Sequence, residues 1–254
     1  MQTNPKIIFK PITLEANAKI IQSFYFEERE KSDFHNVLCE YFPELQDIHK
    51  NITKEKISAI IKNIVSDYYT SNSQNIKEAC KKYSTIWNKY NDIYFKKLAN
   101  YLNVNWPINK NEITCYVGML PLFPRDIDNY AFYINPHLNE EKLTEACAHE
   151  TLHFLWFTKW KTLYPEISKT EYESPYLVWQ YSEMVTDPIL NNPEFQSIFN
   201  FTEKAYPEFY KLQKNGKFVM EELTKIYRAN TNIEDKITTG YEYLKNLNFK
   251  EEEK

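Results

Sequence analysis

The stretch Ala148-His149-Glu150-Thr151-Leu152-His153-Phe154-Leu155-Trp156-Phe157 combines two histidines and a glutamate with uncharged, mostly apolar neighbours. A helix that is apolar on nearly every side belongs in a protein core. On such a helix His149 and His153 lie one turn apart on one face, and Glu150 projects beside them. Buried polar groups need partners, because unpaired ones cost free energy. A divalent metal ion would satisfy all three; the alternative is a pair of hydrogen-bonded core histidines beside a chance glutamate.

A catalytic zinc site takes three protein ligands and keeps one open position, so a third ligand is needed. The pattern that supplies a third histidine from the same segment is excluded, since Trp156 stands at its glycine position and Lys159 at its last histidine position. No histidine follows His153. The third ligand is therefore expected to be a carboxylate.

Glu183 is the best carboxylate candidate. Ser174-Pro175 predicts a helix start, with Ser174 as the N-cap and Pro175 in the first turn, and we expect this helix to cover 175–191. Glu183 and Asp187 then lie one turn apart on the same face. Ligating histidines usually donate their second ring N–H to a carboxylate, and Asp187 is placed for that role. The alternative is that both acids are solvated helix charges.

These two segments resemble the gluzincin metallopeptidases, the thermolysin-like group. The second motif of that family is similar to Asn-Glu-x-x-Ser-Asp, and Ser182 and Thr186 are conservative departures from it. The resemblance covers about residues 145–190. The segment between the two motifs is longer than usual for the family, which leaves Glu166, Glu171 and Glu173 as weaker ligand candidates.

Carried over by position, the resemblance implies that His149, His153 and Glu183 bind Zn²⁺. It implies that Glu150 is the general base and acid of peptide hydrolysis, and that Asp187 is the partner of His149. A His or Tyr from the C-terminal half usually stabilises the oxyanion in this family. With no histidine there, a tyrosine is implied, and we expect Tyr227, beside Arg228, to take this role. The other candidates are Tyr206, Tyr210, Tyr241 and Tyr243.

The predicted fold is a helix-rich α+β structure with a small mixed sheet beside the active-site helix, zincin-like by resemblance. Runs rich in β-branched and aromatic residues predict strands at Ile113–Val117 and Ala131–Ile134, and a shorter one at Lys6–Phe9. Asn129–Ile134 is the expected substrate-pairing edge strand, with an ordinary interior strand as the alternative. Asn139 is expected to cap a helix over 139–161.

We expect a mostly helical N-terminal subdomain at 1–110 and a catalytic domain at 111–254. The expected N-terminal helices are 14–30, 53–70 and 74–102, and the C-terminal ones are 194–213, 217–230 and 233–247. His137, shortly before the capping residue, is expected to be a surface turn residue rather than a catalytic one.

The chain of 254 residues has a net charge of −4, which excludes the basic footprint of a nucleic-acid-binding protein. No stretch is apolar enough to span a membrane, and the N-terminus lacks a signal-peptide core. Four cysteines without metal-type spacing favour free thiols and a cytoplasmic protein. The expected partner is a peptide or protein substrate, and oligomeric state is not readable from the sequence.

The sequence thus predicts a zinc metallopeptidase. Two alternatives stay open: a regulatory or binding module with a structural zinc site, and a zinc hydrolase that acts on a non-peptide bond. Glu150 favours an enzyme, because a structural metal site needs no base.

Overall fold

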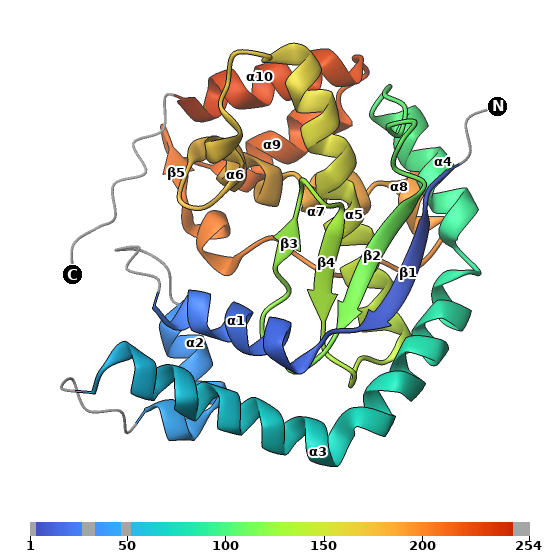
Figure 1. The fold of residues 1–254 in the computed structure, drawn as a ribbon. Coiled ribbons are helices and arrows are strands. Elements are labelled where there is room, and N and C mark those ends of the chain that lie inside the picture. The colour runs from blue at the N-terminus through green and yellow to red at the C-terminus, as the bar shows by residue number, and fades with distance from the viewer. Residues whose placement is uncertain (1–3, 27–33, 47–51, 246–254) are drawn as a thin grey trace. The chain divides into compact units, whose positions relative to one another are not determined.

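The chain folds into a helix-rich α+β structure with a small mixed sheet (Figure 1). The computed structural model describes residues 4–26, 34–46 and 52–245. The chain divides into two compact units. The first unit consists of Met1–Asn91 and Pro107–Ala146, and the second of Asp92–Trp106 and Cys147–Lys254. This division differs from the predicted boundary at residue 110, because the strand near the N-terminus pairs with a strand that follows that boundary.

The sheet of the first unit has the strand order β1-β2-β4-β3. Strands β1 (Lys6–Pro11), β2 (Glu112–Val117) and β4 (Ala131–Ile134) are parallel, and β3 (Arg125–Asp126) runs antiparallel to β4 (Figure 1). The three predicted strands are therefore confirmed, with β1 slightly longer than expected.

The prediction that Asn129–Ile134 is an edge strand is wrong. Ala131 pairs with Thr114 of β2 and with Asp126 of β3, so β4 lies inside the sheet. Three of its four residues are buried, which agrees with an interior strand that is covered on both faces.

The first unit also contains α1 (Leu14–Tyr25), α2 (Phe34–Tyr41), η1 (Pro43–Leu45) and the long helix α3 (Lys54–Trp87). The break expected at about residue 70 is absent. Ser71-Asn72-Ser73 contains no glycine or proline, and such residues disfavour a helix only weakly. Asn72 also donates a hydrogen bond from Nδ2 to the carbonyl of Tyr68, one turn earlier, at 3.0 Å. Its side chain is therefore bonded to the backbone of the helix itself.

Helix α5 (Glu140–Leu163) confirms the helix predicted around the two histidines. Asn139 caps it as expected, because its Oδ1 accepts a hydrogen bond from the N–H of Lys142 at 2.8 Å. The helix is buried on nearly every side, including the fully covered rings of Phe154, Trp156 and Trp160. It runs across the division between the units, and both histidines belong to the second.

The second unit is built from short helices and turns. They are α4 (Asn91–Tyr101, from Asp92 on), η2 (Lys169–Tyr172), α6 (Leu177–Met184), α7 (Thr186–Leu190), α8 (Pro193–Gln196), η3 (Pro207–Lys211), α9 (Val219–Arg228) and α10 (Ile233–Lys245), with the hairpin of β5 (Gln213–Lys214) and β6 (Lys217–Phe218). The last two predicted helices are confirmed. The helix predicted over 194–213 is wrong, because α8 and η3 are separated by an irregular segment, 200–206.

The helix predicted over 175–191 is also corrected, because α6 starts at Leu177 and ends at Met184, and α7 follows. Pro188 explains the interruption. A proline has no N–H, so residue 188 cannot donate to the carbonyl of Met184, and its ring crowds that carbonyl. Val185 links the two helices with φ −81° and ψ −9°.

Gly240 allows α10 to approach α6 closely. A Cβ added at this position would lie 2.3 Å from the hydroxyl oxygen of Tyr181, far inside contact distance. That hydroxyl accepts or donates a hydrogen bond to the Tyr227 hydroxyl at 2.9 Å and donates to the carbonyl of Ile237 at 3.0 Å. The glycine therefore leaves room for a buried hydroxyl pair.

All four cysteines carry free thiols, as predicted. Over the part of the chain that the structure describes, no helix has both the length and the apolar composition needed to cross a bilayer.

Candidate metal centre

The second unit brings His149, His153 and Glu183 together. One ligand atom from each residue lies within 4.8 Å of the other two, and among the described residues no other group of this kind includes three metal-binding side chains. The weaker ligand candidates Glu166, Glu171 and Glu173 are not part of the group. The donor set predicted from the sequence is therefore assembled in space.

The separations suit one small divalent ion. Nε2 of His149 lies 3.2 Å from Oε2 of Glu183, and Nε2 of His153 lies 3.4 Å from Oε1 of Glu183. Ligand atoms at about 2.0–2.2 Å from a tetrahedral zinc ion stand about 3.3 Å apart. The same separations also suit hydrogen bonds from protonated imidazoles, so the geometry fits a metal without identifying it.

The two imidazoles occupy one face of α5. Their ring centroids are 4.8 Å apart with an interplanar angle of 65°, as expected for residues one helical turn apart. His153 and Glu183 are almost fully buried, whereas 16% of the His149 side chain is exposed. The group is therefore reached from solvent along the His149 side.

Local hydrogen bonds fix the backbone that carries these residues. The Tyr94 hydroxyl of α4 donates to the carbonyl of Ala148 at 2.7 Å, and the Thr151 hydroxyl donates to the carbonyl of Cys147 at 2.6 Å. On α6, the Thr186 hydroxyl donates to the carbonyl of Glu183 at 2.7 Å. The Glu183 carbonyl lies in the last turn of α6, where backbone carbonyls lack intrahelical donors, whereas the two α5 carbonyls accept these bonds in the interior of their helix.

Negative charge gathers around His149. Burial lowers the pKa of His149, but the hydrogen bond with Glu183 and the charge of that carboxylate outweigh burial and raise the pKa to about 9. Glu150 and Glu203 add to this rise through their charges. The field that favours a protonated imidazole equally favours a bound divalent cation.

Glu150 is on the same helix and only 6% exposed. Its charge acts on His149 and raises the pKa of the buried Cys147 thiol, after burial itself. A carboxylate beside a ligand histidine and largely withdrawn from water is the arrangement that a general base needs.

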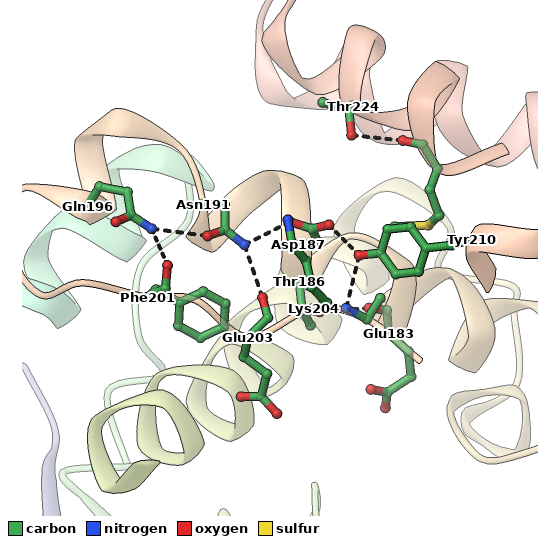
Figure 2. A network of polar contacts seen from close by, with 12 residues as sticks. Glu183, Thr186, Asp187, Asn191, Gln196, Phe201, Glu203, Lys204, Tyr210 and Thr224 are labelled. Atoms are coloured by element: carbon green, nitrogen blue, oxygen red, sulfur yellow. Dashed lines mark hydrogen bonds and ion pairs between the residues drawn. The ribbon is translucent and has the colours of Figure 1, made fainter. Parts of the chain in front are cut away.

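The predicted pairing of Asp187 with His149 is not formed. Asp187 instead accepts hydrogen bonds from the Tyr210 hydroxyl and from Asn191 Nδ2 at 2.7 Å, and Lys204 Nζ lies 3.4 Å away (Figure 2). The Nδ1 atom of His149 has no hydrogen-bond partner among the described residues. The interruption between α6 and α7 is the physical reason, because the two acids do not share one regular helix. We call Asp187, Asn191, Lys204 and Tyr210 the Asp187 network.

The Asp187 network anchors the irregular segment 200–206. Asn191 donates from Nδ2 to the carbonyl of Glu203 at 3.1 Å, and the N–H of Ala205 donates to the Tyr210 hydroxyl at 3.2 Å. In Figure 2 the Glu183 carboxylate points away from this network. Glu203 could not be selected from the sequence, since no helix or strand period connects this segment to the motif.

Tyr227 lies in a different environment from the one predicted. It is fully buried, and its hydroxyl is hydrogen bonded to that of Tyr181 at 2.9 Å. Burial raises the pKa of Tyr227. Because an oxyanion-binding hydroxyl must reach the substrate, this placement argues against the predicted role. His137 lies in the first unit, at an exposed turn, with Nε2 3.3 Å from the Tyr68 hydroxyl, in agreement with a turn residue.

Comparison of the chain with protein-family models, with curated protein sequences and with solved structures finds no match. The chemistry of the site is therefore interpreted from its own residues.

Proposed function

We propose that this protein is a zinc-dependent metallopeptidase of the gluzincin type, with a zincin-like core formed around α5 and α6. The observation that supports it most is the convergence of two histidines and a glutamate, from two helices, beside a further buried glutamate. Two imidazoles and one carboxylate are a donor set that suits zinc in hydrolytic enzymes.

His149 and His153 would hold the ion through Nε2, and Glu183 through its carboxylate. Bound zinc lowers the pKa of a coordinated water to about 7 and polarises a carbonyl group. Glu150 accepts the proton of the attacking water and later delivers it to the leaving amine. The limited exposure of the group, through His149 alone, keeps most bulk water from the reacting atoms.

A structural zinc site and a pair of hydrogen-bonded core histidines are the competing explanations. Neither explanation requires a glutamate at position 150, whereas a hydrolase requires a base beside the metal ligands. A zinc hydrolase acting on a non-peptide bond uses the same residues, and only the substrate screen separates it from a peptidase.

The test combines metal analysis with one substitution. We expect the purified protein to contain about one zinc ion per chain, and a peptide library to be cleaved by the wild type. Glu150→Gln is expected to retain zinc and lower turnover by about 10²–10⁴-fold, because it removes the base and leaves the ligands in place. Glu166→Gln, at an exposed position, is the matched control and should match the wild type.

A protein without bound metal after zinc loading would refute the site. Bound zinc with undiminished turnover in Glu150→Gln would refute the mechanism, and bound zinc with no turnover of any library member would favour a structural site.

A further inference from the structure

A cavity of about 610 Å³ lies in the first unit, where the turn after α2 meets one side of α3. Ile60, Ile64, Asp67 and Tyr68 line it from α3 at positions i, i+4, i+7 and i+8, which share one side of a helix. The segment 41–44 lines it from the end of α2 and the start of η1. Its volume falls within the range of small-molecule sites, about 300–1,000 Å³.

The apolar part of the lining is continuous with the core of this unit. Phe42 and Met119 are buried in one hydrophobic cluster, and Ile64 and Tyr68 pack against that cluster. The buried side chain of Asn17 fixes the backbone of Met119, because its Oδ1 accepts from the N–H and its Nδ2 donates to the carbonyl, both at 2.9 Å. Packed side chains and a fixed backbone therefore bound the cavity.

Three aromatic rings also line the cavity: Tyr41, Phe42 and Tyr68. The ring of Tyr41 is 45% exposed and stands nearly perpendicular to that of Phe42, with the centroids 4.8 Å apart. The Tyr68 hydroxyl lies 3.3 Å from Nε2 of His137. Burial, followed by the charge of Tyr41, raises the pKa of Tyr68 to about 12, so its phenol is neutral at physiological pH. The faces of such rings carry negative partial charge.

The charged part of the lining has one sign. It consists of the carboxylates of Glu44 and Asp67, and none of the residues that line the cavity is basic. Neither carboxylate forms an ion pair with another residue of the described part of the chain. Carboxylates and ring faces both attract positive charge, so the cavity is complementary to a cation.

We propose that this cavity binds a small organic cation, an ammonium or quaternary ammonium group carried on an apolar body. The cationic group would contact Glu44, Asp67 and the tyrosine rings, and the apolar body would lie against Ile64 and Met119. Aromatic rings are the usual partners of quaternary ammonium groups in proteins. The metal ligands belong to the other unit, so this site goes beyond the proposed peptidase function and does not depend on it.

Calorimetric titration of the whole chain compares three probes of similar shape: 2-phenylethylammonium, the neutral 2-phenylethanol and the anionic 3-phenylpropanoate. We expect the ammonium to bind about tenfold or more tightly than the alcohol, and the anion not to bind. Benzyltrimethylammonium should bind as well. An increase in ionic strength from about 0.01 M to about 0.1 M shortens the Debye length from about 30 Å to about 10 Å and should weaken binding of the ammonium only.

Substitutions in the lining locate the binding. Asp67→Asn and Glu44→Gln, both at exposed positions, should each weaken binding of the ammonium by about threefold, and together by about tenfold. Tyr41→Leu should weaken binding of benzyltrimethylammonium by a similar factor, because it keeps an apolar side chain and removes the ring. Glu78→Gln is the matched control, since it removes an exposed carboxylate of α3 outside the cavity and should leave both affinities unchanged.

The same titrations are repeated with excess zinc and with a chelator, and we expect equal affinities. Binding that requires zinc would assign the cation to the metal centre and overturn this site. Equal affinity for the ammonium and the alcohol, or a preference that survives the double substitution, would also overturn it. The peptide acetyl-Ala-Lys-Ala-amide should bind more weakly than the small amine; equal or tighter binding would replace the small molecule with a basic peptide. Absence of peptide cleavage bears only on the proposed peptidase function.

Discussion

Helix α5 carries two clusters of charged side chains about two turns apart, and they solve burial differently. Lys159 is 4% exposed and forms an ion pair with Glu234 of α10, while its Nζ also donates to the carbonyl of Asn103 at 3.2 Å. Around His149 and His153, by contrast, carboxylates outnumber cations, and the pKa of His149 is raised to about 9 as a result. In the first cluster the ammonium and the carboxylate neutralise each other. In the second cluster, the carboxylates that act on His149 have only the two imidazoles as basic partners.

The two clusters differ in their balance of charge, and this balance is the property that separates a structural ion pair from a set of metal ligands. A structural pair combines opposite charges with hydrogen bonds that satisfy both partners. A ligand set brings acceptors of one kind to separations that only a cation or extra protons make favourable. The predictions that follow test this distinction, starting with the largest effect.

Removal of metal should change stability more than any single substitution below. A ligand that binds only the folded state stabilises it by about 4 kcal/mol when its concentration is about 1,000 times Kd. We expect a chelator to lower the Tm of the wild type, and zinc to restore it, in scanning calorimetry. Glu183→Ala should abolish this response because it removes a ligand, whereas Lys159→Met should retain it. A wild-type Tm that changes with neither zinc nor chelator would show that the second cluster is stable without a bound ion.

Glu234→Gln should lower the free energy of unfolding by about 2–3 kcal/mol, because it leaves the buried Lys159 ammonium with a weaker, neutral partner. Urea unfolding monitored by circular dichroism measures the change. Lys159→Met removes the charge together with its need for a partner, so it should cost less. Equal costs for the two variants would contradict the account of a self-contained pair.

The same pair predicts a pH dependence. The hydrogen bond from Lys159 is the largest cause that lowers the pKa of Glu234, to about 2. Since the unfolded-state value is about 4.3, the carboxylate stabilises the fold above that pH, and its contribution disappears as the pH falls towards 2. The difference in unfolding free energy between wild type and Glu234→Gln should therefore shrink across this acid range and stay constant at neutral pH.

Asp187→Asn tests where the second acid of the motif acts. The Asp187 network predicts a loss of about 1–2 kcal/mol in unfolding free energy, since charge-assisted hydrogen bonds are weakened. It also predicts little change in zinc affinity. If Asp187 oriented His149 instead, competition with a chelating dye should show zinc affinity falling by about 10–100-fold.

Tyr227→Phe should have the smallest effect. Loss of its hydrogen bond with Tyr181 is expected to cost about 1 kcal/mol, because Tyr181 retains the carbonyl of Ile237. Turnover of the zinc-loaded enzyme should stay within about twofold of the wild type. A drop of about 10²-fold or more would restore Tyr227 as the oxyanion donor.

The sequence was sufficient to predict the parts of the molecule that depend on local pattern. The histidine spacing and apolar flanks predicted α5 and its cap, and the β-branched runs predicted three strands. Glu183 could be selected because the chain has no later histidine and because its helix is apolar.

The features that could not be predicted from the sequence are those that depend on interrupted helices and on irregular backbone. Pro188 was the available signal that α6 would end at Met184, and it explains why Asp187 leaves the face of Glu183. Glu203 and Tyr206 lie in a segment without regular structure, so no period links them to the ligands. The position of β4 inside the sheet depends on β3, which has only two residues and no strand signature.

Gly240 affects the position of the Glu183 carboxylate from a distance, through Tyr181. The Tyr181 hydroxyl occupies the space that a side chain at position 240 would need. Tyr181 is two residues before Glu183 on the same short helix. Any residue larger than glycine must push that rigid phenol, and with it the turn that aims the carboxylate. A substitution at Gly240 is therefore expected to shift the Glu183 carboxylate while the side chains of His149, His153 and Glu183 themselves stay the same.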